Sequence, residues 1–258
     1  MVRPKKHLGQ HFLKDKNIAR KIADCLPDNY DTVCEIGPGT GILTNALLEK
    51  QQIKKLILIE IDNESAEYLK THIEDKRITL YKADFLKIDI GQISKKPFAL
   101  IGNYPYNISS QIFFKALNNR DIIPVISGMI QKEVAERIVA KPGNKTYGIL
   151  SVLLQTWYDI KYCFTVNENV FFPPPKVKSA VIKLTRNSNK KLDCDEKLYT
   201  KMVKTAFNQR RKTLRNSLKK ILPDEIKSKN IFDKRPEQLS IAEFIEITKM
   251  IEKSANNY

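Results

Sequence analysis

Short apolar runs alternate with amphipathic stretches between residues 30 and 185, and this alternation constrains the fold more than any other feature of the chain. The pattern is typical of strands joined by crossover helices in an α/β sheet. Only a short proline-rich segment joins the last two of these runs, so we expect those two strands to be antiparallel. Seven strands are predicted, at Thr32–Ile36, Leu56–Ile61, Ile78–Lys82, Phe98–Gly102, Pro124–Ile130, Ile160–Val166 and Ser179–Leu184.

Helices are expected between these strands and after the last of them. They begin near Gly41, Asn63 and Ser109 and cover residues 132–140 and 148–158, whereas residues 83–97 are expected to form a loop. After residue 186 the strand pattern stops, residues 187–191 are typical of a linker, and apolar residues recur at helical spacing between 198 and 251. We therefore predict an α/β domain over residues 1–186 and a small helical domain over residues 187–258.

The charge of the chain indicates a polyanionic partner. There are 45 Lys and Arg residues against 29 Asp and Glu, a net charge of +16. Residues 201–220 hold eight basic and no acidic residues, and residues 1–21 hold seven basic residues and one acidic residue. Because phosphate contacts dominate affinity for nucleic acid, the two basic segments favour a nucleic-acid partner.

Two further observations exclude other classes of protein. No apolar run approaches the roughly 20 residues of a membrane-spanning helix, and no apolar stretch of signal-peptide type follows the basic N-terminus, so we expect a cytoplasmic protein with no membrane partner. The four cysteines are scattered without CxxC spacing. We expect reduced thiols and predict neither a metal site nor a disulfide framework.

Three strand ends predict a cofactor site. A glycine-rich turn (CEIGPGTG, residues 34–41) follows the first strand, where Gly37 and Gly39 would let the backbone pass close to a ligand at a helix N-terminus. Glu60 ends the second strand 21 residues after Gly39, the offset at which a carboxylate accepts the hydroxyls of an adenosine ribose. Asp84 follows the third strand. The glycine spacing differs from the GxGxxG of dinucleotide sites, which disfavours an oxidoreductase.

The fourth strand ends in Asn103, Tyr104, Pro105 and Tyr106, which suit methylation of an amine on a planar ring. Such a nitrogen is a poor nucleophile because its lone pair is delocalised into the ring. The Asn103 amide oxygen and the Tyr104 carbonyl can accept its two N–H bonds, Pro105 fixes the turn, and Tyr106 offers a flat face to the base. The chemistry then requires positioning rather than a strong base or a metal ion.

Four separated motifs resemble one family over essentially the whole chain. They are residues 7–13 (HLGQHFL), 103–109 (NYPYNIS), 171–179 (FFPPPKVKS) and 207–214 (FNQRRKTL). In this order they are similar to the ribosomal RNA adenine dimethyltransferases. The fourth motif and residues 235–240 (RPEQLS) resemble most closely the bacterial members that act on the small subunit.

The resemblance implies a seven-stranded, Rossmann-like class I methyltransferase sheet with a small helical C-terminal domain. It implies S-adenosylmethionine as cofactor and N6,N6-dimethylation of two adjacent adenines in the 3′-terminal hairpin of 16S rRNA, on an immature 30S subunit rather than on DNA, by a monomeric enzyme. The implied cofactor contacts are His11, Leu13, Gly37, Gly39, Glu60, Asp84 and Asn103. His11 stands where most members have asparagine, so its contact is expected through either the side chain or the backbone.

The RNA substrate is expected to meet the proline-rich loop and the basic tail. Phe171 or Phe172 could stack on the flipped adenine against Tyr106, or either ring could pack in the core. Lys176 is a candidate phosphate contact in the same loop. The tail offers three further candidates for contact with RNA, Arg210, Arg211 and Lys212.

Three alternative functions remain to be compared with this one. Relatives that methylate a large-subunit adenine and confer macrolide resistance share the first three motifs, and only the tail separates them from the small-subunit enzymes. An RNA-binding assembly factor without turnover is disfavoured by the presence of Glu60, Asp84, Asn103 and Tyr106. A dinucleotide-dependent oxidoreductase is disfavoured by the glycine spacing.

Overall fold

The computed structural model describes residues 2–255 and divides the chain into two compact units. A sheet unit comprises Met1–Ala135 and Ile160–Arg186, and a helical unit comprises Glu136–Asp159 and Asn187–Tyr258. Residues 136–159 are thus grouped with the tail, whereas the predicted boundary at residue 186 assigns them to the α/β domain. No helix within the described residues is long and apolar enough to cross a membrane.

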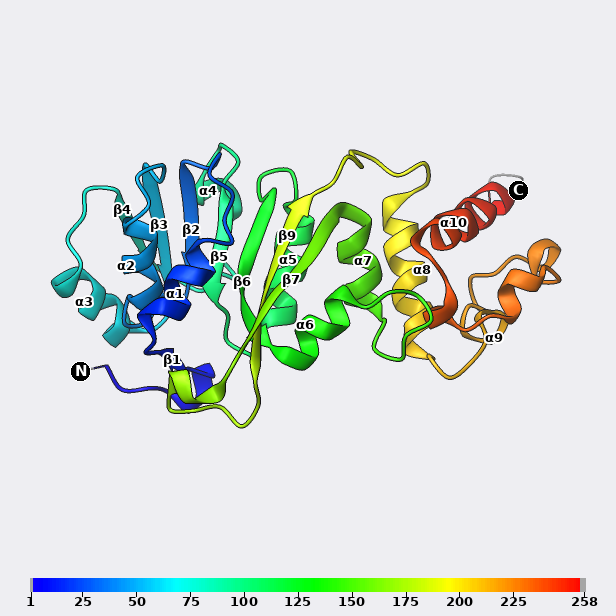
Figure 1. Ribbon diagram of the computed structural model, residues 1–258. Helices are drawn as coiled ribbons and strands as arrows, with labels where there is room; N and C mark the ends of the chain where they lie inside the picture. Colours follow the sequence, from blue (N-terminus) through cyan, green and yellow to red (C-terminus); the bar gives the residue numbers. More distant parts are fainter. Residues whose placement is uncertain (1, 256–258) are drawn as a thin grey trace. The chain divides into compact units, whose positions relative to one another are not determined.

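The sheet unit is built on seven strands, as predicted (Figure 1). Five neighbouring strands are parallel, and the strand Ser179–Arg186 pairs with the strand Val125–Gln131 in the antiparallel sense. Strands buried on both faces need nearly continuous apolar sequence, which explains runs such as residues 56–59 (LILI). The spatial order is β4 (Ile78–Lys82), β3 (Lys55–Glu60), β2 (Thr32–Ile36), β5 (Ala99–Asn103), β6 (Val125–Gln131), β9 (Ser179–Arg186) and β7 (Tyr158–Val166).

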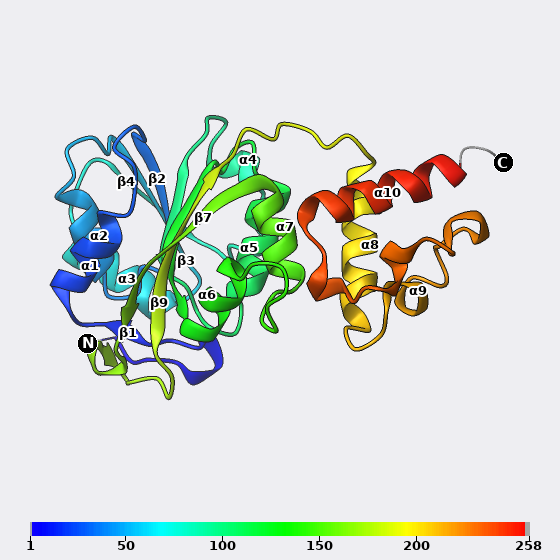
Figure 2. The same ribbon diagram turned by 45° about the vertical axis from the view of Figure 1, so that its right-hand side comes forward.

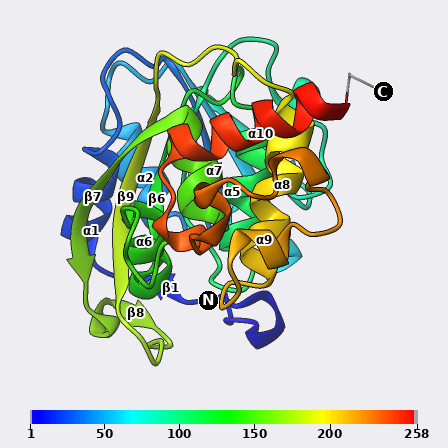
Figure 3. The same cartoon turned by 90° about the vertical axis from the view of Figure 1, so that its right-hand side faces the viewer.

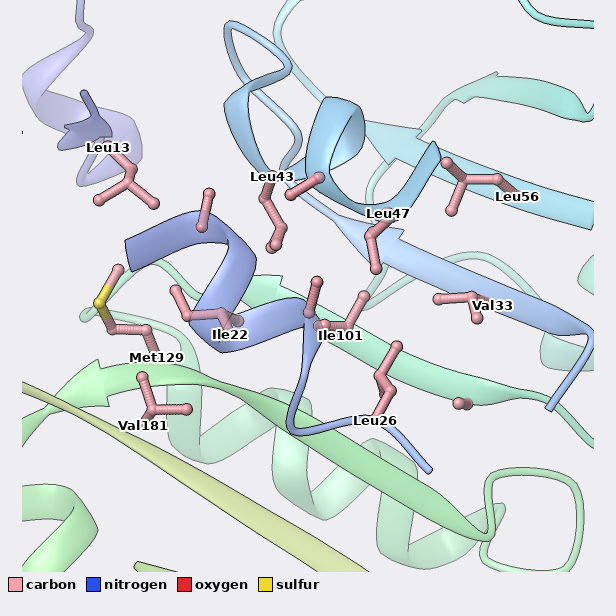
Figure 4. Packing of buried hydrophobic residues seen from close by; sticks show 14 of the residues in the cluster. Leu13, Ile22, Leu26, Val33, Leu43, Leu47, Leu56, Ile101, Met129 and Val181 are labelled. Atoms are coloured by element: carbon pink, nitrogen blue, oxygen red, sulfur yellow. The ribbon is translucent and has the colours of Figure 1, made fainter. Parts of the chain in front are cut away.

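Helices α1 (Lys16–Ala23) and α2 (Ile42–Leu48) cover one face of this sheet, and α5 (Ser109–Asn118) lies on the other side (Figure 2). Figure 4 shows how Ile22 of α1 and Leu47 of α2 meet Val33 and Ile101 of the strands in one buried cluster. The other helices that begin in this unit are α3 (Asn63–His72), α4 (Ile90–Ile93) and α6 (Lys132–Val139). Helix α4 is one turn within the segment that we expected to be a loop, capped by the Asp89 side chain.

A second, two-stranded sheet was not predicted. Strand β1 (Phe12–Leu13) pairs antiparallel with β8 (Phe171–Phe172), so that Phe12 lies opposite Phe172 and Leu13 opposite Phe171 (Figures 1 and 3). Short 3-10 helices flank the two strands, η1 (Lys6–Leu8) and η2 (Glu168–Val170). This pairing joins the start of the chain to the proline-rich loop.

In the helical unit, α8 (Glu196–Asn208) packs against α7 (Ile149–Trp157), α9 (Leu214–Ser217) and α10 (Ile241–Ala255). All four helices are labelled in Figure 3. Inside it, the buried hydroxyls of Thr156 and Tyr199 are hydrogen-bonded at 2.7 Å. Helix α9 is shorter than its apolar spacing suggested. Three single-turn 3-10 helices follow it, η3 (Asp224–Ile226), η4 (Asn230–Asp233) and η5 (Pro236–Gln238).

Candidate active site

A cavity of about 280 Å³ opens at the carboxyl edge of the parallel strands. The residues that follow β2, β3, β4 and β5 contribute to its wall, because parallel strands deliver their carboxyl ends to the same edge of the sheet. Residues 7–12 form another part of the wall. The cavity brings together nine of the predicted site residues, His11, Gly37, Gly39, Glu60, Asp84, Asn103, Tyr104, Pro105 and Tyr106.

The glycine turn gives this wall a backbone surface. Gly37 and Gly39 have φ angles of 64° and 56°, in the left-handed region that favours glycine. A Cβ atom on Gly37 would meet no atom within 4 Å, so the backbone there borders open space. A Cβ atom on Gly39 would lie 2.9 Å from the Phe12 ring, so only glycine fits under the N-terminal segment.

Glu60 is buried at the end of β3 with only 2% of its surface exposed. One carboxylate oxygen accepts the Gly39 N–H at 3.0 Å, and the other accepts the Asp62 N–H at 2.9 Å. Burial raises the pKa of Glu60, and these two backbone hydrogen bonds oppose the rise. Each oxygen has a further lone pair, so the carboxylate can also accept two hydroxyl groups of a ligand.

Asp84 and two apolar side chains complete this half of the cavity. The Asp84 Oδ1 atom accepts the Leu86 N–H at 2.9 Å, which orients the carboxylate. Ile61, whose surface is 50% exposed, and Phe85 line the cavity beside the two carboxylates. Two carboxylates, apolar walls and an open glycine backbone fit the ribose, the adenine ring and its amine in S-adenosylmethionine.

Asn103 ends β5 at the other half of the cavity. Its Nδ2 atom donates to the backbone carbonyl of His11 at 2.9 Å. Because a carbonyl only accepts, this bond fixes the amide orientation and identifies Oδ1 as the acceptor that remains for a substrate. The predicted role of Asn103 as a hydrogen-bond acceptor is therefore compatible with its geometry.

The side chain and the backbone of Tyr104 have different roles. The ring is 1% exposed, and its hydroxyl donates to the Ser127 carbonyl at 2.8 Å. The ring fits against Gly102 and Gly128, where added Cβ atoms would lie 2.8 Å and 2.6 Å from its carbon atoms. The side chain thus anchors the turn in the core while the residue lines the cavity, as expected if the carbonyl is the functional group.

Tyr106 is held from two sides. Its hydroxyl shares a hydrogen bond of 2.5 Å with the Ser179 hydroxyl, and its ring stacks on the His11 ring with centroids 5.6 Å apart and planes 27° apart. Burial raises the pKa of Tyr106, and the Ser179 bond opposes the rise. The phenol therefore stays neutral at physiological pH, where its ring can serve as a wall for a base.

Four other predicted residues lie outside the cavity wall. Leu13 and Phe171 are buried in the hydrophobic cluster of the sheet unit, with 6% and 1% of their surfaces exposed. Phe172 is 54% exposed, and Lys176 is exposed in the same loop. Of the two adjacent phenylalanines, only Phe172 therefore presents its ring to solvent.

The three basic residues of the tail differ in their surroundings. Arg210 donates to the Lys145 carbonyl and lies 3.9 Å from a Glu237 carboxylate oxygen, so it is tied into the helical unit. Arg211 and Lys212 are exposed on the turn after α8.

Sequence reasoning missed several residues of the wall. His7 lines the cavity, as do Gln10, Phe12 and Asn107. The Lys5 ammonium forms an ion pair with Asp62, which fastens the N-terminal segment beside Glu60. Burial raises the pKa of Asp62, but the hydrogen bonds from Lys5 and Ser65 outweigh this effect and hold the pKa below its usual range. The only sequence signal for this wall was the motif at residues 7–13.

Comparisons with known proteins show which family the chain resembles. The family model described as "Ribosomal RNA adenine dimethylase" matches residues 1–253. The protein named ribosomal RNA small subunit methyltransferase A in Parabacteroides distasonis is 57% identical to this chain, over 100% of this chain and 98% of that one. The protein of the same name in Flavobacterium johnsoniae is 59% identical to this chain, over 97% of each.

Two solved structures are similar over nearly the whole chain. A dimethyladenosine transferase from Plasmodium falciparum has a TM-score of 0.81 at 26% identity, covering 95% of this chain and 98% of that one. The 23S rRNA methyltransferase ErmE has a TM-score of 0.67 at 26% identity, covering 92% and 99%.

Proposed function

Because the chain belongs to the ribosomal RNA adenine dimethylase family, we propose that it dimethylates the N6 amines of two adjacent adenines in the 3′-terminal hairpin of 16S rRNA. It is a methyltransferase of the class I fold, and S-adenosylmethionine is its cofactor. When bound, the cofactor supplies a methyl group made electrophilic by its positively charged sulfur. The relatives named for the small subunit support the choice of 16S rRNA over the large subunit.

One cavity with two different ends is the observation that supports this function most strongly. Glu60 and Asp84 lie at or just after the ends of β3 and β4, on one side of β2 in the sheet, where they suit an adenosyl group, and Asn103 and Tyr106 lie at or just after the end of β5 on its other side. The Asn103 Oδ1 atom and the Tyr104 carbonyl would each accept one N–H of the target amine. The bond from Asn103 to the His11 carbonyl orients the amide before any substrate arrives, so little reorganisation is needed during the reaction.

The exposed residues of the loop and the tail would contact the rRNA. Phe172 is the aromatic side chain available for stacking, because Phe171 is in the core. Lys176, Arg211 and Lys212 are exposed and would contact phosphates. We propose residues 187–258 as the main rRNA-binding segment, an immature 30S subunit as the substrate, a monomeric enzyme and a cytoplasmic location.

Methyl transfer to purified subunits tests the catalytic proposal. Radiolabelled S-adenosylmethionine is incubated with unmethylated small and large subunits, and the labelled nucleotides are mapped. We expect label in two adjacent adenines of 16S rRNA. Label confined to the large subunit would instead assign the chain to the macrolide-resistance activity.

Replacement of Asn103 tests the role of its amide. The Asn103→Ala variant is expected to lose about 100-fold or more in turnover, because a preorganised hydrogen-bonding group at the reacting atom is removed. Its affinity for S-adenosylmethionine should change little. The control is Asn118→Ala, the same change at an exposed position at the end of α5. Wild-type turnover of Asn103→Ala would refute the assigned role.

The salt dependence of subunit binding tests the tail. Removal of two phosphate contacts in Arg211→Ala/Lys212→Ala should reduce the slope of log affinity against log salt concentration by about 1.5 to 2. The matched control, Lys95→Ala/Lys96→Ala, removes two adjacent exposed lysines that precede β5, at the sheet edge opposite the cavity. Equal slopes in both variants would exclude Arg211 and Lys212 from the RNA contact.

A further inference from the structure

The His11 side chain connects three segments that are far apart in the chain. Its Nδ1 atom lies 2.7 Å from the Pro173 carbonyl oxygen, and its ring stacks on Tyr106. Because a carbonyl oxygen only accepts, Nδ1 must carry the hydrogen in this contact. The backbone carbonyl of the same residue accepts the Asn103 amide N–H. One residue therefore contacts both candidate substrate-binding side chains and the proline-rich loop.

The loop over residues 173–179 is attached at both of its ends to the same pair of rings. Pro173 at one end accepts from His11, and Ser179 at the other end is hydrogen-bonded to the Tyr106 hydroxyl. The His11 and Tyr106 rings stack on each other, so the two ends of the loop are linked through this pair of rings. Gly9 brings the N-terminal segment against the same turn, because a Cβ atom there would lie 2.6 Å from the Asn107 side-chain oxygen.

We propose that His11 is a positioning residue for methylation: its imidazole holds the Tyr106 ring and the Pro173 end of the loop in the arrangement that receives the target adenine. The inference rests on the proposed function, because it concerns the placement of the base in that reaction. His11 itself forms no bond with the reacting atoms. It acts through Tyr106, which presents its ring to the base, and through the loop that carries the exposed Phe172.

Two substitutions separate the two contacts of the imidazole. In His11→Asn the side-chain amide nitrogen can occupy nearly the position of Nδ1 and donate to Pro173, but the stacking ring is lost. In His11→Phe a ring can still stack on Tyr106, but the donor is lost. His11→Ala removes both contacts, and all three variants keep the backbone carbonyl that orients Asn103.

His72 provides a matched control. Its ring stacks on Tyr68 with centroids 3.9 Å apart, and its Nδ1 atom lies 2.9 Å from the Tyr68 carbonyl oxygen. The same two kinds of contact thus occur at the end of α3, and His72 is not among the residues that line the cavity. The His72→Ala variant is expected to methylate at the wild-type rate.

The kinetic test measures kcat, the KM for small subunits and the Kd for S-adenosylmethionine. Loss of one hydrogen bond or one stack corresponds to about a three- to tenfold fall in kcat for His11→Phe and His11→Asn, and to a larger fall for His11→Ala. The Kd should stay within about twofold, because the proposal assigns the His11 imidazole to Pro173 and Tyr106 and leaves contact with the cofactor to the backbone of residue 11, which every variant keeps. A wild-type kcat in His11→Ala would overturn the proposal. It would also be overturned if the Kd weakened in proportion to the fall in kcat, because His11 would then only support the cofactor wall.

A second measurement does not depend on turnover. Nitrogen-15 NMR should show the Nδ1–H tautomer for His11, which is readily assigned by loss of its signals in His11→Asn because the chain has only three histidines. Hydrogen exchange across residues 171–179 should accelerate in His11→Ala but not in His72→Ala. Unchanged exchange, or the Nε2–H tautomer, would refute the link to Pro173. If the wild type fails to methylate small subunits while both results hold, the proposed function is wrong and the link stands.

Discussion

Glu35 is a buried acid that should make the sheet unit less stable as the pH rises. It lies in β2 with 1% of its surface exposed, and the Thr44 hydroxyl donates to its carboxylate at 2.7 Å. Burial raises the pKa of Glu35 to about 8, against the Thr44 hydrogen bond and with the help of the nearby Glu60 charge. Its ordinary value is 4.5. The neutral form is therefore favoured in the folded protein.

The number of protons bound in the folded and unfolded states determines how stability changes with pH. Between pH 4.5 and about 8 the folded chain holds a proton on Glu35 that the unfolded chain has released. The free energy of unfolding should then fall by about 1.4 kcal/mol for each pH unit across this window. The stabilisation is complete below pH 4.5 and is lost by pH 8, a total of at most about 5 kcal/mol.

The Glu35→Gln variant removes this titration and keeps an oxygen that can accept from Thr44. Urea denaturation, followed by circular dichroism at pH 5.5 and pH 7.5 and constant ionic strength, gives the free energy of unfolding for both proteins. The wild type should lose about 3 kcal/mol more than the variant over these two units. Glu74→Gln, an exposed control, should follow the wild type. Parallel curves for wild type and Glu35→Gln would refute the reasoning.

Four further substitutions test the packing around the cavity and the neighbouring two-stranded sheet. Gly128→Ala places a Cβ atom 2.6 Å from the Tyr104 ring, so methyl transfer should fall at least about tenfold and the Tm should drop. Tyr104→Phe loses the bond to Ser127 and should lower the free energy of unfolding by about 1 kcal/mol, with transfer rates kept within about twofold because the carbonyl remains. Phe171→Ala should cost about 3 to 5 kcal/mol in urea denaturation, whereas Phe172→Ala should change stability by less than about 0.5 kcal/mol.

The sequence was most informative where local pattern and strand order determine position. Apolar runs identified all seven strands of the main sheet, two of them at both ends and the others with an end displaced by one or two residues. The parallel order of the first strands then placed Gly37, Glu60, Asp84 and Asn103 at one edge, where the cavity lies. These predictions succeeded because each depends on periodicity within about ten residues and on a general rule of sheet topology.

The features that the sequence did not predict depend on contacts between distant segments. Whether Phe171 or Phe172 is buried is decided by pairing of β8 with β1, and a strand of two residues has no periodicity to reveal it. The orientation of Asn103 depends on a carbonyl at His11, 92 residues earlier in the chain. Local spacing also overestimated α9, since helical spacing continued to Leu222 but the helix ends at Ser217.

The pairing of β1 with β8 has a consequence for how the enzyme is made. Residues 7–13 emerge from the ribosome well before residues 171–179, which hold their partners in the two-stranded sheet and the loop. The glycine turn and the strand ends can assemble on a shorter nascent chain, but the wall that faces them cannot close until this later segment has been synthesised. The binding site is therefore expected to mature late in translation, after most of its own residues are in place.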